Sequence, residues 1–229
     1  MKKLFIFDLD NTFYEYDEAH LLGLKKVFNS QEMFNDFNDF YDSYEIIKKK
    51  VHITNPENPS KHSKLIYFKN MFKDLNFLKI LNLEEIYWLE FISKARLQKK
   101  AIEILKTKKN EKYVYFLFTN QNLNTQLKKI TEWELNFFDK ITTSEEVGYE
   151  KPHVNFFNLV SSDVSQYVND GYKIYALGDD YDNDINYWTK NYGAEGYLIN
   201  NKLEEKAKPN DESTYSLNEA ITKIFSNSD

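Results

Sequence analysis

Apolar residues follow two patterns along this chain, one in its first residues and its C-terminal half and one in the stretch between. In the first pattern, short apolar runs alternate with amphipathic segments, which is typical of buried strands that alternate with helices. We expect the strands at residues 4–7, 112–118, 137–143, 173–177 and 196–199. We expect the helices at residues 95–105, 123–133, 155–160, 185–192 and 217–225. This alternation builds right-handed βαβ units, so it predicts an α/β fold with a doubly wound, Rossmann-like parallel sheet.

Residues 15–95 carry the second pattern, in which apolar positions recur at helical spacing and glycine and proline are scarce. Four amphipathic helices are expected here, and a segment rich in Asn, Pro and Ser at 54–60 separates the second from the third. The helical stretch interrupts the alternating pattern after its first strand. We therefore predict a core domain of residues 1–14 and 96–229, with an all-helical cap domain of residues 15–95 inserted into it.

Composition limits the class of protein. The 229 residues carry 30 Lys and Arg against 36 Asp and Glu, and this net charge of -6 offers no basic surface for nucleic acid. The absence of cysteine excludes disulfides, thiolate catalysis and thiolate metal sites, and it fits a reducing cytoplasm. No apolar run approaches the ~18 residues of a membrane span. We expect a cytoplasmic protein, monomer or homodimer, with neither nucleic acid nor a membrane as its partner.

Candidate chemistry begins where the first strand ends. Asp8 and Asp10 follow the apolar run directly, and residues two apart on a strand point to the same side. In an open parallel sheet, ligands bind outside the carboxyl ends of the strands. Two carboxylates held close together need a cation, a proton or a shared task to offset their repulsion. Taken alone, the pair could instead end the strand and begin a turn, so the other polar clusters must decide.

Two of these clusters lie in the middle of the chain. Thr119 and Asn120 follow the second long strand and offer a hydroxyl and amide groups that suit a phosphate oxygen, although Thr-Asn is also a common helix cap. Lys151 stands before a proline that favours a helix start, a place where a lysine is also common on the surface.

The strand at 173–177 runs into a dense cluster of carboxylates at residues 178–184. The alternating Asp residues imitate a calcium-binding loop, but Ile185 stands where such a loop needs glycine and Asn191 where it needs glutamate. Carboxylates at converging strand ends suit Mg²⁺ instead, which accepts a few carboxylates together with waters and a substrate phosphate.

In order and spacing, the four clusters resemble the motifs of the haloacid dehalogenase superfamily of phosphohydrolases. The first motif, Asp-x-Asp-x-Thr after a strand, matches residues 8–12, and the second, a Ser or Thr that ends a strand, matches Thr119. The third, Lys followed by Pro, matches Lys151. The fourth, Gly-Asp with Asn-Asp a few residues on, matches Asp179 and Asp184. The resemblance covers the core domain, whereas the helical insertion matches only in position and kind.

The resemblance implies a role for each matching residue. Asp8 would be the nucleophile that attacks phosphorus and forms an aspartyl-phosphate. Asp10 would be the general acid for the leaving alcohol and then the general base for the hydrolytic water. Thr119, Asn120 and Lys151 would bind phosphoryl oxygens as their charge shifts in the transition state.

The resemblance also implies a cofactor, Mg²⁺. The side chains of Asp8 and Asp179 and the backbone carbonyl of Asp10 would bind it, and Asp184 would support both its waters and Lys151. The implied function is that of a Mg²⁺-dependent phosphatase acting on a small phosphorylated metabolite, such as a nucleotide or a sugar phosphate.

Other functions share parts of this pattern. A phosphomutase of the same superfamily has all four motifs and remains an alternative, as does an inactive binding protein on this scaffold. A dehalogenase proper lacks the second Asp of the first motif, so Asp10 argues against that activity. The natural substrate stays open. So do the roles of Asp180, which could contact the metal or only solvent, and of Tyr14, Tyr16 and His20, which could contact substrate or pack within the insertion.

Overall fold

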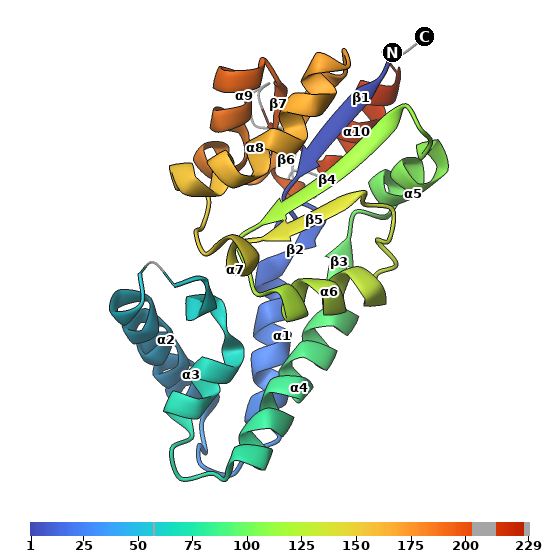
Figure 1. Cartoon of the computed structure of the whole chain (residues 1–229). Coiled ribbons are helices and arrows are strands. Elements are labelled where there is room, and N and C mark those ends of the chain that lie inside the picture. The colour runs from blue at the N-terminus through green and yellow to red at the C-terminus, as the bar shows by residue number, and fades with distance from the viewer. Residues whose placement is uncertain (57, 203–213, 227–229) are drawn as a thin grey trace. The chain divides into compact units, whose positions relative to one another are not determined.

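The computed structural model describes residues 1–56, 58–202 and 214–226, and it divides into two compact units (Figure 1). The first, here called the α/β unit, combines Met1–Glu15 with Arg96–Asp229. The second, here called the helical unit, is Tyr16–Ala95. The division lies one residue from the predicted boundary at 14/15 and coincides with the one at 95/96.

A parallel sheet forms the centre of the α/β unit. Its strands, over the described residues, are β1 (Lys3–Phe7), β4 (Tyr113–Thr119), β5 (Lys140–Thr143), β6 (Lys173–Gly178), β7 (Glu195–Ile199) and β8 (Thr214–Tyr215). They lie in the order β5-β4-β1-β6-β7-β8, and every neighbouring pair is parallel. This confirms the predicted α/β class. Because β1 lies between β4 and β6 in register, the residues that follow these three strands emerge side by side.

Helices cover both faces of the sheet because successive residues of a strand point to opposite sides. Leu4 and Ile6 face the core that contains residues of α8 (Val154–Asn169) and α9 (Asn186–Tyr192). Phe5 points the other way and stacks on Phe225 of α10 (Leu217–Ser226), which packs beside α5 (Lys99–Lys108). All five residues of β1 are buried. A strand covered on both faces reads as an unbroken apolar run, which is why the sequence predicted it well.

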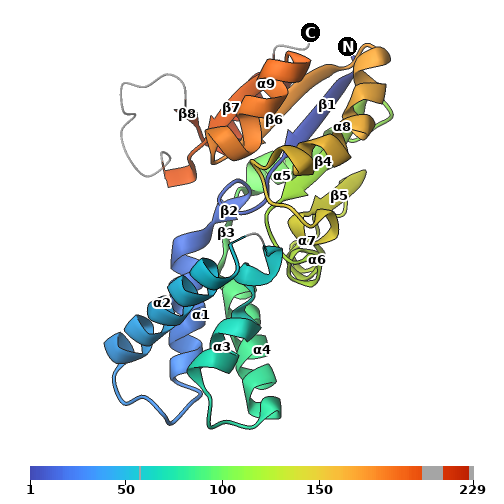
Figure 2. The same cartoon turned by 60° about the vertical axis from the view of Figure 1, so that its left-hand side comes forward.

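The helical unit is built from α1 (Tyr16–Phe28), α2 (Phe37–Thr54), the 3₁₀ turn η1 (Pro59–His62), α3 (Lys64–Met71) and α4 (Phe77–Lys94). Helices α1 and α4 lie side by side (Figure 2). Gly23 allows this close approach, because a Cβ there would lie 2.9 Å from the ring of Tyr87. Asn76 caps the start of α4, where its side chain accepts from the N–H of Lys79.

Several elements of the α/β unit differ from their predictions. Strand β5 begins only at Lys140, helix α8 continues to Asn169, and helix α7 (Ser144–Val147) and strand β8 were not predicted. The helix expected from residue 95 begins only at Lys99, because Arg96–Leu97 forms strand β3 and pairs antiparallel with strand β2, Tyr14–Glu15. Two-residue strands carry no readable period, and their pairing joins segments that are far apart in the sequence. Within the part of the chain that the structure describes, no helix is long and apolar enough to cross a membrane.

Candidate active site

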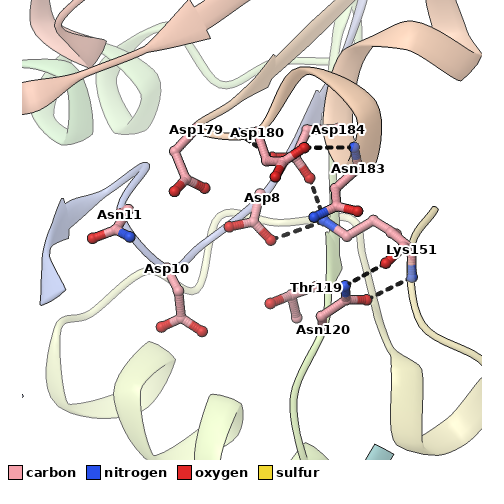
Figure 3. Close-up of a pocket in the computed structure, with 10 residues that line it drawn as sticks. All are labelled: Asp8, Asp10, Asn11, Thr119, Asn120, Lys151, Asp179, Asp180, Asn183 and Asp184. Atoms are coloured by element: carbon pink, nitrogen blue, oxygen red, sulfur yellow. Dashed lines mark hydrogen bonds and ion pairs between the residues drawn. The ribbon is translucent and has the colours of Figure 1, made fainter. Parts of the chain in front are cut away.

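The polar residues that follow β1, β4 and β6 line one pocket of about 150 Å³ (Figure 3). Its lining residues are Asp8, Asp10, Asn11, Thr119, Asn120, Lys151, Asp179, Asp180, Asn183 and Asp184. All of the residues predicted for the site are among them, and all belong to the α/β unit. The parallel sheet brings most of them together, because the carboxyl ends of its central strands meet at one edge, and Lys151 joins them from the segment between β5 and α8.

Lys151 joins two carboxylates at the base of the site. Its Nζ donates to Asp8 Oδ1 at 2.9 Å, to Asp184 Oδ1 at 2.7 Å and to the carbonyl of Phe118 at 2.6 Å. All three charged groups are buried, which is costly unless the charges are paired and hydrogen-bonded. Burial alone would lower the pKa of Lys151, but the charges of Asp184 and Asp8 outweigh it and raise that pKa.

Asp8 itself lies in an environment that opposes its negative charge. Burial, together with the charges of Asp184, Asp10 and Asp179, raises the pKa of Asp8 to about 8, although Lys151 acts in the opposite direction. A second positive charge beside Asp8 would therefore favour its ionised form.

Asn120 lies in the pocket with its side chain turned toward Lys151 (Figure 3). The backbone N–H of Lys151 donates to Asn120 Oδ1 at 2.7 Å, and Asn120 Nδ2 donates to the carbonyl of Lys151 at 2.8 Å. Thr119 is fully buried at the end of β4. The amide of Asn120 thus fixes the segment that carries Lys151.

The segment after β6 brings Asp184 back over the strand end. A Cβ on Gly178 would lie 2.2 Å from Asp184 Oδ2, so only glycine allows this approach. Asp180 is exposed, and its Oδ1 accepts from the N–H groups of Asp182 and Asn183, both at 3.0 Å, at the start of the π-helical turn Tyr181–Ile185. Asp180 thus has a capping role in the structure, at the margin of the pocket.

Three carboxylates of the pocket are close enough to share a cation. One oxygen each of Asp8, Asp179 and Asp184 lies within 4.8 Å of the other two. Loss of solvent around its carboxyl group, together with the charge of Asp184, raises the pKa of the otherwise exposed Asp179 to about 6. Five carboxylates and one lysine line the pocket. These hard oxygen donors and their excess negative charge fit Mg²⁺.

Sequence analysis did not identify Lys129 and Gln126 as neighbours of Asp10. Lys129 Nζ lies 2.5 Å from Asp10 Oδ1, Gln126 Nε2 donates to Oδ2 at 3.0 Å, and the hydroxyl of Tyr14 donates to Oδ1. Burial alone would raise the pKa of Asp10, but the charge of Lys129 and these hydrogen bonds lower it. One signal was present: Lys129 lies on the buried face of the amphipathic helix α6 (Leu123–Glu132), where a charge is unusual.

The other tyrosine and the histidine whose roles were open belong to the helical unit. His20 is buried, and its Nδ1 lies 2.7 Å from the hydroxyl of Tyr87. Burial lowers the pKa of His20 to about 2. Tyr16 packs its ring against those of His20 and Phe91. Both residues therefore have packing roles within the helical unit.

The family of the chain follows from a comparison with known proteins. A family model described as haloacid dehalogenase-like hydrolase matches residues 2–186, well over half of the chain. The chain belongs to the haloacid dehalogenase-like hydrolases. This confirms the resemblance, and the matched range contains every residue predicted for the site. The chain is therefore a hydrolase by family.

Relatives of this haloacid dehalogenase-like hydrolase include enzymes that act on different bonds. The chain is 26% identical over 188 residues to ribulose-1,5-bisphosphate 5-phosphatase from Halopiger xanaduensis. The matched segment covers 79% of this chain and 77% of that protein. Among solved structures, it resembles a magnesium-bound hydrolase of the same superfamily from Bacillus subtilis, with 21% identity, a TM-score of 0.63 and coverage of 98% and 97% of the two chains.

A second solved structure carries a different activity on the same fold. It is the 2-haloacid dehalogenase from Pseudomonas syringae, with 13% identity, a TM-score of 0.64 and coverage of 99% of both chains. At such identities, the solved structures show the fold of this haloacid dehalogenase-like hydrolase and leave its reaction to the residues of its own pocket.

Proposed function

We propose that the chain is a Mg²⁺-dependent phosphatase that hydrolyses the monoester of a small phosphorylated metabolite through an aspartyl-phosphate on Asp8. The observation that carries the proposal is the presence of two carboxylates, Asp8 and Asp10, in one pocket with a different lysine bound to each. Two carboxylates in different environments can take different roles, one as nucleophile and one as acid and base.

In the first step, an oxygen of Asp8 attacks phosphorus and the bond between phosphorus and the alcohol oxygen breaks. Protonated Asp10 gives its proton to the leaving oxygen, so that a neutral alcohol departs and Asp10 becomes a carboxylate. Lys151 and Thr119, which line the same pocket, bind phosphoryl oxygens during the transfer.

In the second step, a water molecule attacks phosphorus while the Asp10 carboxylate takes its proton. The bond between Asp8 and phosphorus breaks, which releases inorganic phosphate and restores both aspartates. The proton that Asp10 gave to the alcohol is thus replaced by one from water, and the cycle balances.

The metal belongs to this proposal because the pocket is too negative to receive a phosphate group unaided. The residues that would hold Mg²⁺ are Asp8 and Asp179 by their carboxylates and Asp10 by its backbone carbonyl. Asp184, bound to Lys151 and to the N–H of Asp180, would support them. When bound, Mg²⁺ supplies positive charge that offsets the charge of the phosphate and of the aspartates.

The presence of Asp10 also favours a reaction in which Asp8 attacks phosphorus over one in which it attacks carbon. An enzyme that displaces halide from carbon has no leaving alcohol to protonate, whereas a phosphatase needs a proton donor at this position. The phosphatase from Halopiger xanaduensis makes sugar phosphates the first substrates to test. The helical unit, inserted after the first motif, would act as a cap that encloses a small substrate.

The test is a screen of the purified protein against phosphate monoesters, sugar phosphates among them, with Mg²⁺ present. We expect phosphate release by the wild type, none by Asp8→Asn, and normal release by Asp182→Asn, which removes a neighbouring exposed carboxylate. Chelation by EDTA should stop the reaction and Mg²⁺ should restore it. Equal turnover by Asp8→Asn, or full activity in EDTA, would contradict the proposal.

A further inference from the structure

The carboxylate of Asp10 is bound by a second lysine, separate from the one that binds Asp8. In Figure 3 it points away from the group formed by Asp8, Lys151 and Asp184. Lys129 Nζ lies 2.5 Å from its Oδ1. Asp10 and Asp8 therefore belong to two distinct lysine–carboxylate groups within one pocket.

Helix α6 supplies two of the donors to the Asp10 carboxylate, Gln126 and Lys129. Lys129 and Gln126 are both fully buried, and they lie three residues apart, on the same face of the helix. Gln126 Nε2 donates both to Asp10 Oδ2 at 3.0 Å and to Thr119 Oγ1 at 2.7 Å, so it ties Asp10 to the end of β4. Tyr14 completes the group: its hydroxyl donates to Asp10 Oδ1 and lies 3.2 Å from Lys129 Nζ.

These contacts leave one side of the carboxylate available. An ionised carboxylate has about four acceptor positions, and the three donors occupy two on Oδ1 and one on Oδ2. The side chain of Asp10 is 24% exposed, whereas that of Lys129 is 0% exposed. The remaining acceptor position is therefore on Oδ2, and the carboxylate cannot rotate without breaking buried hydrogen bonds, which is costly.

We propose that Lys129 is a positioning residue that holds the Asp10 carboxylate, with Tyr14 and Gln126, where it takes the proton of the water that hydrolyses the aspartyl-phosphate. The proposal rests on the proposed function of Asp8 and Asp10. The three donors contact both oxygens of Asp10 and hold its carboxylate in one orientation for this hydrolytic step. Tyr14, Gln126 and Lys129, here called the brace, form a buried, charge-assisted group of donors that the sequence motifs do not include.

A positioning role in the second step has a specific kinetic consequence. The p-nitrophenolate ion leaves readily without a proton, so with p-nitrophenyl phosphate the first step does not depend on Asp10. The ratio kcat/KM reports only events up to formation of the aspartyl-phosphate, whereas kcat includes its hydrolysis. Loss of the brace should therefore lower kcat and KM together and leave kcat/KM nearly unchanged.

The experiment compares Lys129→Met with the wild type on p-nitrophenyl phosphate and Mg²⁺. We expect kcat to fall about tenfold or more, with kcat/KM little changed, because a small misplacement of a catalytic group has effects of this size. A burst of p-nitrophenolate should precede the steady state, since the aspartyl-phosphate accumulates. Lys128→Met, the same change at the preceding residue, is the control and should behave as the wild type.

Two further variants separate positioning from a general structural role. Tyr14→Phe removes one donor and keeps the ring, so it should show the same split between kcat and kcat/KM to a smaller degree, even if Lys129→Met folds poorly. In an Asp10→Asn background, Lys129→Met should cause no further loss, because Lys129 acts only through Asp10.

The outcomes distinguish the two proposals. Equal falls of kcat and kcat/KM in both Lys129→Met and Tyr14→Phe, or a further loss in the Asp10→Asn background, would overturn the positioning role while Asp8-dependent turnover of the wild type stands. A wild type without Asp8-dependent turnover of any ester would overturn the proposed function and this inference with it.

Discussion

At the scale of single residues, two buried lysines give two neighbouring aspartates different properties. Lys151 binds Asp8 together with Asp184, and Lys129 binds Asp10. Burial raises the pKa of Asp8 to about 8, whereas the charge of Lys129 outweighs burial and lowers the pKa of Asp10. The two carboxylates are therefore surrounded by different charges, although they are only two residues apart in the sequence.

The buried ion pairs of Lys151 make a stability prediction. Lys151→Met should lower the free energy of unfolding by about 3 kcal/mol or more, because removing one partner leaves Asp8 and Asp184 buried without a compensating charge. Urea unfolding in metal-free buffer measures this change.

The control is the same substitution in an exposed ion pair. Lys140 pairs with Asp163, and both side chains are about one-third exposed. Lys140→Met should therefore cost less than about 1 kcal/mol. Losses of equal size in Lys140→Met and Lys151→Met would contradict the role of Lys151 as the cation that keeps the buried carboxylates paired.

At the scale of elements, the sequence predicts what a single segment determines and misses what depends on packing. Strands β1, β4 and β6 were predicted because they are buried on both faces and read as apolar runs. The residues after them, such as Asp8, Thr119 and Asp179, could be placed in one site because parallel strands end at one edge of the sheet.

The brace around Asp10 could not be predicted in the same way. Lys129 and Gln126 are separated from Asp10 by more than a hundred residues and contact it only because of how α6 packs. The pairing of β2 with β3 likewise joins Tyr14–Glu15 to Arg96–Leu97, across the whole helical unit. Long-range contacts of this kind leave no period in the sequence.

Packing inside the helical unit gives a second prediction, on pH. Burial lowers the pKa of His20 in the folded chain to about 2, whereas an unfolded histidine titrates near pH 6.5. The unfolded state thus binds the extra proton below pH 6.5, so stability is lost as the pH falls. Between pH 7 and pH 5, the titration of His20 should therefore lower the free energy of unfolding by about 2 kcal/mol.

The measurement compares the wild type with His20→Asn, whose amide cannot take up a proton in this range and can still bond to Tyr87 near the position of Nδ1. The variant should lose less stability than the wild type between pH 7 and pH 5 in urea unfolding. Parallel losses in the two proteins would show that His20 is free to ionise in the folded state.

At the scale of the whole molecule, the helical unit is inserted into the α/β unit between two residues that are paired on adjacent strands. Glu15 and Arg96 are partners in the antiparallel pairing of β2 and β3, so the chain leaves and re-enters the α/β unit at adjacent positions. Every residue that lines the pocket lies in the α/β unit. The α/β unit therefore contains its sheet, its core and its site without residues 16–95.

This arrangement predicts that the α/β unit folds on its own. Replacing residues 16–95 by Asn-Gly would turn β2 and β3 into a hairpin, because a two-residue turn of this kind joins antiparallel partners. We expect a protein that melts cooperatively and retains slow, Asp8-dependent hydrolysis of p-nitrophenyl phosphate. A chain that aggregates or shows no cooperative transition by circular dichroism would contradict the independence of the unit.

The covalent step on Asp8 can be observed directly. The Asp10→Asn variant should form the aspartyl-phosphate from p-nitrophenyl phosphate and hydrolyse it slowly, because the base for the second step is missing. Acid quenching and peptide mass measurement should then find one phosphoryl group on Asp8, and none in the variant that also carries Asp8→Asn. Release of phosphate with Asp8 unmodified throughout, or a phosphoryl group on another residue, would contradict nucleophilic attack by Asp8.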